Sequence, residues 1–315
     1  MKTRTLSVLL SVLVTNSLYG DIIYVDSSAP GGDGTSWMQA FTDLQDAFDA
    51  ALDNGDGIDE IWVTGGTYLP TYRMDENPDY GETEINDRAV VLVPWGNVEV
   101  YGGFAGDETE RSQRDFNANP TIISGDLNGD DLPNWQNRED NAYTLFILHL
   151  GTWTCGNDYS SDFGLFGPFL IDGVILKGAH LTQPPPGHEV ACWRTAGGAV
   201  MKAGAHYGGT EYHRVTMKNC TVQDNFCRHD YQNYHVEGIL WFDLEYPITL
   251  DNVLVENNYA DRYVVKMIGS DSHPSYVTNC TFARNGTPDY RIPGTIFYFH
   301  GDDGGTDGNP EYRLG

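Results

Sequence analysis

The chain has 315 residues, enough for one large domain or two, and 40% of them are hydrophobic, which is sufficient for a sizeable core. Its 45 acidic residues against 18 basic ones give a formal net charge of −27. This charge repels phosphate groups, so nucleic acids and anionic membrane surfaces are unfavourable partners. Acidic chains attract cations, and Ca²⁺ is the usual one outside cells.

Residues 1–20 have the pattern of a secretory signal peptide. Lys2 and Arg4 supply a positive start, and the apolar run at 6–14 that follows is too short to span a bilayer. Small or polar residues come next, so we expect cleavage between Ser17 and Gly20. The alternative is a core strand near a free N-terminus. The pattern predicts a secreted or cell-surface protein with no membrane span after signal removal.

Residues 21–58 are expected to form a strand, "DIIYVD", and one amphipathic helix. Apolar residues recur there at helical spacing: Phe41, Leu44, Phe48 and Leu52. Ser36 is the expected start of the helix and Gly55 its expected end.

Further strand-like runs follow, each ended by Gly or Asp: "DEIWVTGGTY", "AVVLVPWGNVEVYGGF", "TIISGDLNG" and "NAYTLFILHLG". A repeat then covers 169–285, in four copies: "FLIDGVILKGA", "VTMKNCTVQDN", "ITLDNVLVENN" and "SYVTNCTFARN". Apolar residues occupy the first, third, sixth and eighth positions, with Ser275 as the exception. Alternation with a period of two predicts a strand with one buried face, and the step of three predicts a bend.

The bend falls on a residue that tolerates left-handed backbone: Gly173, Asn219, Asn252 or Asn279. A second Asn follows six residues later in three copies, as Asn225, Asn258 and Asn285. Stacked Asn side chains can bond one another from coil to coil.

Other strand-like pieces lie between the repeats: "GGAVMKAG", "EGILWFDL", "RYVVKMIG" and "GTIFYFHG". Each coil would then have about three short strands, with equivalent positions stacked ~4.8 Å apart. We predict an all-β solenoid, a parallel β-helix, over 59–315, with the N-terminal helix covering its open end. An antiparallel sandwich with chance similarity is the alternative, which four copies in one phase disfavour.

Four stretches resemble secreted, planctomycete-type bacterial β-helix proteins: "IYVDSSAPGGDGTSWMQAFTDLQDAFDAA", "DEIWVTGGTYLPT", "VEVYGGFAGDETERSQRDF" and "NPTIISGDLNGDD". The resemblance covers residues 22 to about 145 closely, and the later coils only as generic repeats. It implies a right-handed parallel β-helix in an extracellular setting, and most members have no assigned activity. Many members continue beyond a segment resembling 312–314, so we expect further coils or an anchoring tail after Gly315.

The chain has five cysteines and no CxxC pair, so a structural zinc site is disfavoured. Cys220 and Cys280 occupy the same inward position, with Val253 in the coil between them, so they lie roughly 9–10 Å apart. That exceeds disulfide reach, and both are expected to be buried apolar thiols. The others are expected in loops: Cys155, Cys192 and Cys227. Cys192 and Cys227 follow equivalent strands and form the candidate disulfide.

The stretch "SGDLNGDD" is a candidate calcium loop. Asp126, Asn128 and Asp130 alternate as in an EF-hand, but the sixth position is Asp131 instead of Gly and the twelfth is Asn137 instead of Glu. It is therefore not an EF-hand. A polar turn is the favoured interpretation, and a Ca²⁺ site completed by oxygens of a neighbouring coil is the alternative.

Catalysis on a polysaccharide would need acids or bases facing a groove. Asp224 and Glu256 loosely meet the spacing of ~5–10 Å for a glycoside hydrolase. Lys202 or Lys266 could serve a lyase as the base, next to Ca²⁺ that neutralises a uronate. No recognisable motif joins these residues, so an enzyme is the less favoured interpretation.

Aromatic residues gather in or beside the long loops: Trp153, Trp193, Tyr207, Tyr212, Tyr231, Tyr234 and Trp241. Flat rings beside polar loops suit sugar stacking, and they equally suit burying loops against the solenoid. Our leading interpretation is a secreted or cell-surface protein with a structural or adhesive role and glycan binding through loops on one side. It requires no cofactor, although Ca²⁺ can bind. A purely structural module of a longer surface protein is a third interpretation.

Overall fold

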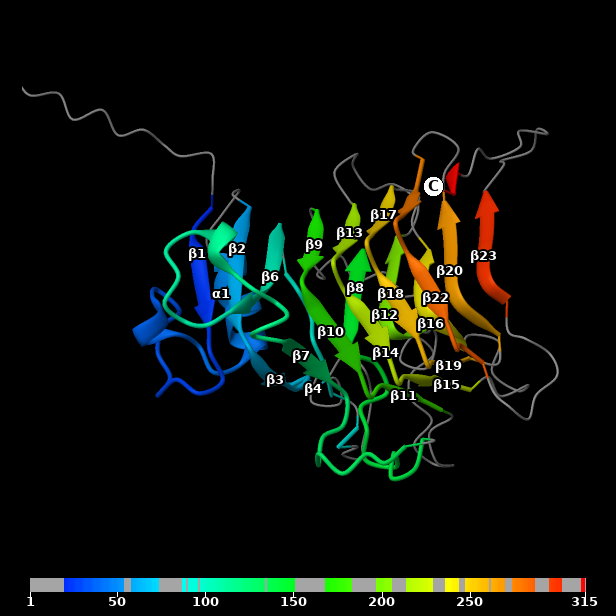
Figure 1. Cartoon of the computed structure of the whole chain (residues 1–315), viewed down its shortest axis with the longest axis horizontal. Coiled ribbons are helices and arrows are strands. Elements are labelled where there is room, and N and C mark those ends of the chain that lie inside the picture. The colour runs from blue at the N-terminus through cyan, green and yellow to red at the C-terminus, as the bar shows by residue number, and fades with distance from the viewer. Residues whose placement is uncertain are drawn as a thin grey trace, which may run out of the picture.

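The computed structural model describes most of the strand-forming chain and not the expected signal segment. It describes residues 20–53, 58–73, 87–88, 90–95, 97–133, 135–150, 168–182, 197–205, 214–228, 236–243, 247–260, 262–269, 274–286, 295–301 and 313–314. Strands predominate in these residues, and they run as a stack from the N-terminal end, blue in Figure 1, to the C-terminal end, red.

Most strands belong to four parallel sheets. The eight-stranded sheet has the order β1 (Ile22–Val25), β2 (Asp59–Thr64), β6 (Val98–Phe104), β9 (Phe169–Asp172), β13 (Val215–Lys218), β17 (Ile248–Asp251), β21 (Tyr276–Thr278) and β24 (Arg313–Leu314). The six-stranded sheet has the order β22 (Thr281–Ala283), β18 (Leu254–Glu256), β14 (Thr221–Gln223), β10 (Val174–Lys177), β7 (Thr121–Ser124) and β3 (Gly66–Tyr68).

Two further sheets complete each coil. The five-stranded sheet has the order β23 (Thr295–Gly301), β20 (Tyr263–Gly269), β16 (Val236–Asp243), β12 (Gly197–Ala205) and β8 (Phe146–Leu150). The three-stranded sheet contains β11 (His180–Leu181), β15 (Phe226–Cys227) and β19 (Tyr259–Ala260). Outside these sheets, β4 (Tyr72–Arg73) pairs antiparallel with β5 (Val90–Val91).

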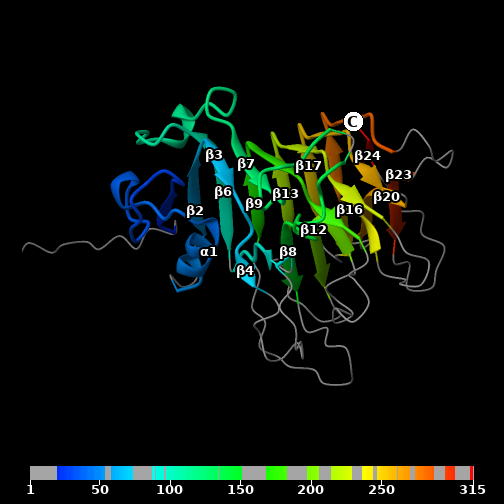
Figure 2. The same cartoon turned by 90° about the horizontal axis from the view of Figure 1, so that it is seen from below.

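In the middle coils the chain visits the four sheets in turn, so each sheet receives one strand from each of these coils (Figures 1 and 2). It passes from β9 to β10, β11 and β12, and then repeats the path through β13, β14, β15 and β16. Neighbouring strands of these sheets are parallel, for example β13 with β9 and β17. The all-β parallel prediction is confirmed and the antiparallel sandwich is wrong. The two-residue fourth strand of each middle coil was not predicted.

Residues with left-handed backbone separate the strands, as predicted for the first bend. Positive φ angles occur there at Gly173 (77°), Asn219 (50°), Asn252 (56°) and Asn279 (56°). A second set follows the strands of the six-stranded sheet: Gly178 (76°), Asp224 (55°), Asn257 (52°) and Arg284 (53°). Gly, Asn and Asp adopt this conformation at low cost, which explains their recurrence at one position of each coil.

The predicted Asn ladder is present inside the solenoid. The Asn225 side-chain amide donates to Asn258 Oδ1, and the Asn258 amide donates to Asn285 Oδ1, each at 3.0 Å. Asn225 and Asn258 are fully buried. The Ala179 N–H donates to Asn225 Oδ1 at 3.0 Å, so the ladder joins four consecutive coils. Buried amides tolerate this position because their groups are paired.

Apolar side chains of all four sheets form one continuous core from Ile23 to Val277. Equivalent positions stack in rows, such as Ile171, Met217 and Leu250 in the eight-stranded sheet. The alternation seen in the sequence therefore marks the inward face, as predicted.

The N-terminal helical segment is shorter than predicted. A 3₁₀ turn covers Trp37–Gln39, and the α-helix α1 covers Leu44–Asp53. Ser36 precedes the 3₁₀ turn but makes no side-chain capping bond, whereas Asp43 Oδ1 accepts the Gln45 N–H at 2.7 Å. The carboxylate satisfies a backbone donor at the helix start.

The core face of α1 also differs from the predicted stripe. Leu44, Ala47, Phe48 and Ala51 are buried, whereas Leu52 is 55% exposed. Spacings of three, four and seven residues place the buried set on one side of the helix, and Leu52 lies beyond its edge. Phe41 forms a strand bridge with Val25 and is not helical. Gly55 lies outside the described residues.

The cysteines partly follow the prediction. Cys220 is buried and Cys280 is half-buried, and both are free thiols that pack in or against the core. Burial raises the pKa of Cys220 to about 12. Cys227 is not in a loop: it lies in β15 and is 2% exposed. Cys192 and Cys155 lie outside the described residues, so the Cys192–Cys227 disulfide stays a prediction.

Candidate functional site

Three residues singled out in the sequence lie side by side on the five-stranded sheet. Lys202 in β12, Trp241 in β16 and Lys266 in β20 are direct register partners in successive coils. Their neighbours in each strand, such as Met201 and Leu240, belong to the core. Because side chains alternate along a strand, the three point away from the core. We call them the cation–aromatic row.

Both lysine ammonium groups of this row lie close to the Trp241 ring. The Lys202 and Lys266 Nζ atoms lie 5.5 and 5.9 Å from the centroid of the Trp241 ring. These distances are within the range of cation–π attraction. Lys202 is 8% exposed, and Trp241 and Lys266 are half-buried. The Trp241 Nε1 is buried and has no hydrogen-bond partner among the described residues.

The other aromatic candidates lie outside the described residues: Trp153, Trp193, Tyr207, Tyr212, Tyr231 and Tyr234. Their segments precede or follow β8, β12 and β16 in the sequence. Trp241 is thus the member of the predicted aromatic set that the structure locates. The role of the remaining six in ligand binding stays a prediction.

Asp224 and Glu256, the candidate hydrolase pair, lie on the six-stranded side of neighbouring coils. Asp224 occupies the turn after β14, where its Oδ1 accepts a hydrogen bond from the Asn257 amide. Glu256 ends β18 and forms an ion pair with Arg284. Both carboxylates therefore already have a partner, and Lys202 and Lys266 lie on a different sheet. The structure does not bring the four catalytic candidates together.

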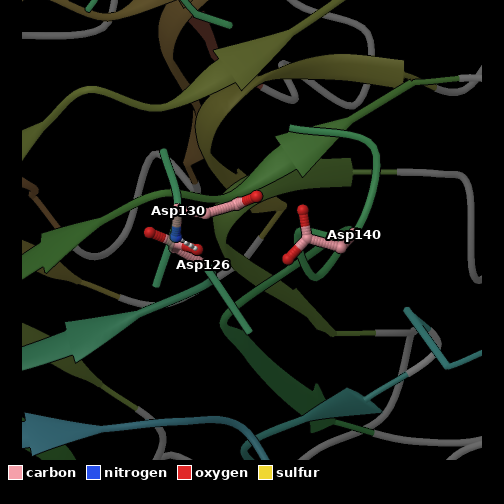
Figure 3. Close-up of side chains that lie close together, drawn as sticks. All are labelled: Asp126, Asp130 and Asp140. Atoms are coloured by element: carbon pink, nitrogen blue, oxygen red, sulfur yellow. Dashed lines mark hydrogen bonds between the residues drawn. The ribbon is translucent and has the colours of Figure 1, made fainter. Parts of the chain in front are cut away.

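Three carboxylates meet in the long loop between β7 and β8. One oxygen of each of Asp126, Asp130 and Asp140 lies within 4.8 Å of the others. Figure 3 shows Asp126 and Asp130 on one stretch of the loop and Asp140 on another. Asp140 comes from the same loop and not from a neighbouring coil. Asp140 was not predicted as a member of this cluster, because no periodic spacing relates it to Asp126 in the sequence.

Backbone N–H groups already donate hydrogen bonds to two of these carboxylates, Asp126 and Asp140. Asp126 accepts the N–H groups of Gly129, Asp130 and Asp131 at 2.7–3.2 Å. The Asn128 N–H donates to Asp140 Oδ2 at 3.1 Å. These bonds are typical of an Asp that closes a polar turn. Oxygen ligands also suit Ca²⁺, so the predicted metal role of Asp126, Asn128 and Asp130 stays a prediction.

The same loop is anchored over the turns of later coils. The Ala142 N–H donates to the Gly125 carbonyl at 2.8 Å, which closes the base of the loop. Arg138 is 5% exposed; it donates to the Asp224 carbonyl, and its Nη2 lies 3.4 Å from Asp131 Oδ2. The Trp135 ring packs edge-on against Tyr259 at 5.9 Å. The loop therefore spans several coils, which its sequence did not indicate.

Asp131 of this loop and His180 of β11 have shifted pKa values. Burial raises the pKa of Asp131 to about 6, although Arg138 and Asn141 oppose the shift. Burial lowers the pKa of His180 to about 4, and its Nδ1 hydrogen-bonds with the Arg138 carbonyl. At neutral pH Asp131 is mostly ionised and His180 is neutral, so Nδ1 carries the proton and donates it.

No family model, curated protein or solved structure matches this chain. Within the described residues, no helix has the length and apolar character required to cross a membrane.

Proposed function

We propose that this protein is an extracellular, right-handed parallel β-helix of the planctomycete type, with a structural or adhesive role. It contacts a glycan through the side formed by the five-stranded sheet. The helix α1 covers the N-terminal end of the solenoid. The stacked parallel sheets, the position of α1 beside β1 and the signal-like start of the sequence support this proposal.

The cation–aromatic row is the observation that carries the glycan contact. The half-buried Trp241 ring and Lys266 ammonium group offer an apolar surface and a polar group in one place, with the buried Lys202 beside the ring. Sugars present C–H groups on a ring face and oxygen acceptors around it, so they match this combination. The row also lies on the sheet whose strands adjoin the aromatic-rich segments in the sequence.

Catalysis is the competing function, as a polysaccharide lyase or glycoside hydrolase. A lyase would use Lys202 or Lys266 as the base. The contact of both ammonium groups with Trp241 favours a binding role instead, because a general base must release its proton.

The test is a screen of neutral and anionic polysaccharides, with and without Ca²⁺, that measures binding and chain cleavage together. We expect saturable binding and no new unsaturated or reducing ends. Lys266→Met and Trp241→Leu should each weaken binding by roughly two- to tenfold, the size expected for a cation–π or stacking contact.

Lys218→Met is the matched control, because Lys218 ends β13 in the eight-stranded sheet. Its binding should equal that of the unmodified protein. Absence of binding to every polysaccharide would contradict the proposal, and new chain ends that disappear in Lys266→Met would establish the lyase instead.

A further inference from the structure

A recess lies at a corner of the solenoid away from the cation–aromatic row, between the 125–141 loop and the turns of later coils. It has a volume of about 350 Å³. The loop contributes Leu132, Trp135 and Arg138, the end of β10 contributes Lys177, and the turns contribute Asp224 and Asn257. We call it the corner cleft. Its volume is at the lower end of the ~300–1,000 Å³ typical of small-molecule pockets, so it suits a ligand the size of one ring.

One wall of the corner cleft is apolar and partly open to solvent. Leu132 is 48% exposed, and Trp135 is half-buried. Trp135 has a φ of 58°, which is uncommon for a bulky residue. The turn therefore keeps the indole in this position against a conformational preference, and such outliers cluster at binding sites.

The other wall carries donors and acceptors. Lys177 is half-buried; its backbone carbonyl accepts the Gly125 N–H, and its ammonium group has no ion pair or hydrogen bond with the described residues. Asp224 Oδ1 accepts from the Asn257 amide, which leaves Asp224 Oδ2 and Asn257 Oδ1 as acceptors without a partner among the described residues. Ammonium, carboxylate and amide groups within one small recess match a ligand with several hydroxyl groups, each of which donates and accepts.

The charges of the corner cleft disfavour an anionic ligand. Arg138 is occupied by Asp131 and by the Asp224 carbonyl. Lys177 and Asp224 line the same cleft with opposite charges, and the three carboxylates of Asp126, Asp130 and Asp140 lie in the loop that forms its other wall. A phosphate or uronate would therefore be repelled by these carboxylates, and the Arg138 guanidinium that could attract it already contacts two acceptors.

We propose that the corner cleft binds one neutral sugar residue. The apolar face of the sugar ring packs on Trp135, and its hydroxyl groups bond with Lys177, Asp224 and Asn257. This site is separate from the cation–aromatic row, because the cleft borders the six- and three-stranded sheets and the row lies on the five-stranded sheet. The proposal holds even if the row binds nothing.

The test is ligand-observed NMR on the full chain, with methyl glycosides of glucose, galactose, mannose and N-acetylglucosamine, and with glucuronate as the acidic arm. We expect saturable binding of at least one neutral glycoside and weaker binding of glucuronate. Trp135→Ala and Lys177→Met should each weaken the neutral glycoside by roughly fivefold or more.

Two controls separate this site from others. Lys218→Met removes a lysine at the end of a strand in another sheet, and Lys266→Met removes one from the cation–aromatic row. Lys218→Met should leave the affinity for the neutral glycoside unchanged, whereas a loss of affinity in Lys266→Met reports binding at the row and not at the corner cleft. If Trp135→Ala lowers the melting temperature, its loss of affinity could reflect unfolding. The affinity of Lys177→Met, a substitution at the end of β10, is then the deciding measurement.

Three results would overturn the proposal: no saturable binding by any neutral glycoside, equal affinity in Lys177→Met, or preferred binding of glucuronate. A loss of affinity in Lys266→Met, with Trp135→Ala unchanged, would place the sugar on the cation–aromatic row and would also overturn it.

Discussion

Single Asn residues hold consecutive coils in register. Asn258 donates to the Val222 and Glu256 carbonyls at 2.9 Å and to Asn285, and its Oδ1 accepts from the backbone and side chain of Asn225. Asn258, Asn225 and Val222 are fully buried, so their polar groups would be unsatisfied without these partners, whereas Glu256 and Asn285 are half-buried. A buried, unsatisfied polar group costs about 1–3 kcal/mol.

Replacing Asn258 should therefore strongly destabilise the folded protein. We expect Asn258→Ala to lower the free energy of unfolding by about 3–5 kcal/mol, because several buried groups lose partners at once. Denaturant unfolding followed by circular dichroism measures the change. The control is Asn252→Gly, which removes an exposed Asn–Asn bond and keeps the left-handed turn, and should cost less than about 1 kcal/mol. Equal losses would contradict an energetic role for burial of the ladder.

At the scale of elements, α1 shows how a local pattern and its packing can disagree. Four apolar residues in the sequence suggested a stripe through Phe41 and Leu52. In the structure the helix begins at Leu44, and Phe48 packs 6.4 Å from Phe146 of β8. Gln45 adds hydrogen bonds to the backbone of Val93 in both directions. The helix is therefore joined to strands well beyond its neighbour β1.

A pair of substitutions on α1 tests which face is buried. Phe48→Ala should lower the free energy of unfolding by about 3–5 kcal/mol, because it removes a fully buried ring. Leu52→Ala should change it by less than about 1 kcal/mol, because Leu52 is largely exposed. Thermal and denaturant unfolding of both variants supplies the comparison. A larger loss for Leu52→Ala would mean that the helix packs through the face predicted from the sequence.

At the scale of the whole molecule, a net charge of −27 affects every measurement with cations. Self-repulsion of a highly charged chain weakens as ionic strength rises, so salt alone is expected to raise the melting temperature. A stabilising effect of Ca²⁺ is therefore not evidence of a calcium site unless it exceeds that of a matched salt.

A test for a calcium site must therefore compare Ca²⁺ with Mg²⁺ at equal ionic strength. After chelation, we expect Ca²⁺ and Mg²⁺ at equal ionic strength to raise the melting temperature equally, since backbone N–H groups already occupy Asp126 and Asp140. Differential scanning calorimetry is the measurement. An excess of several degrees for Ca²⁺, lost in Asp140→Asn, would instead establish a metal site in the 125–141 loop.

The sequence by itself determined the local features of this protein. Alternation at Ile171, Met217 and Leu250 marked the inward face, and Asn219 and Asn252 marked the bends, because both depend on backbone and side-chain geometry within a few residues. The Asn ladder was also predictable, since each of its residues follows the bend of its coil by six positions and so occupies the equivalent place.

Which non-repeating residues meet depends on tertiary packing. Asp140 joins Asp126, Trp135 reaches Tyr259, and Arg138 reaches Asp224, because an insertion without a period folds across later coils. Only packing, and not spacing, sets where such a loop lies.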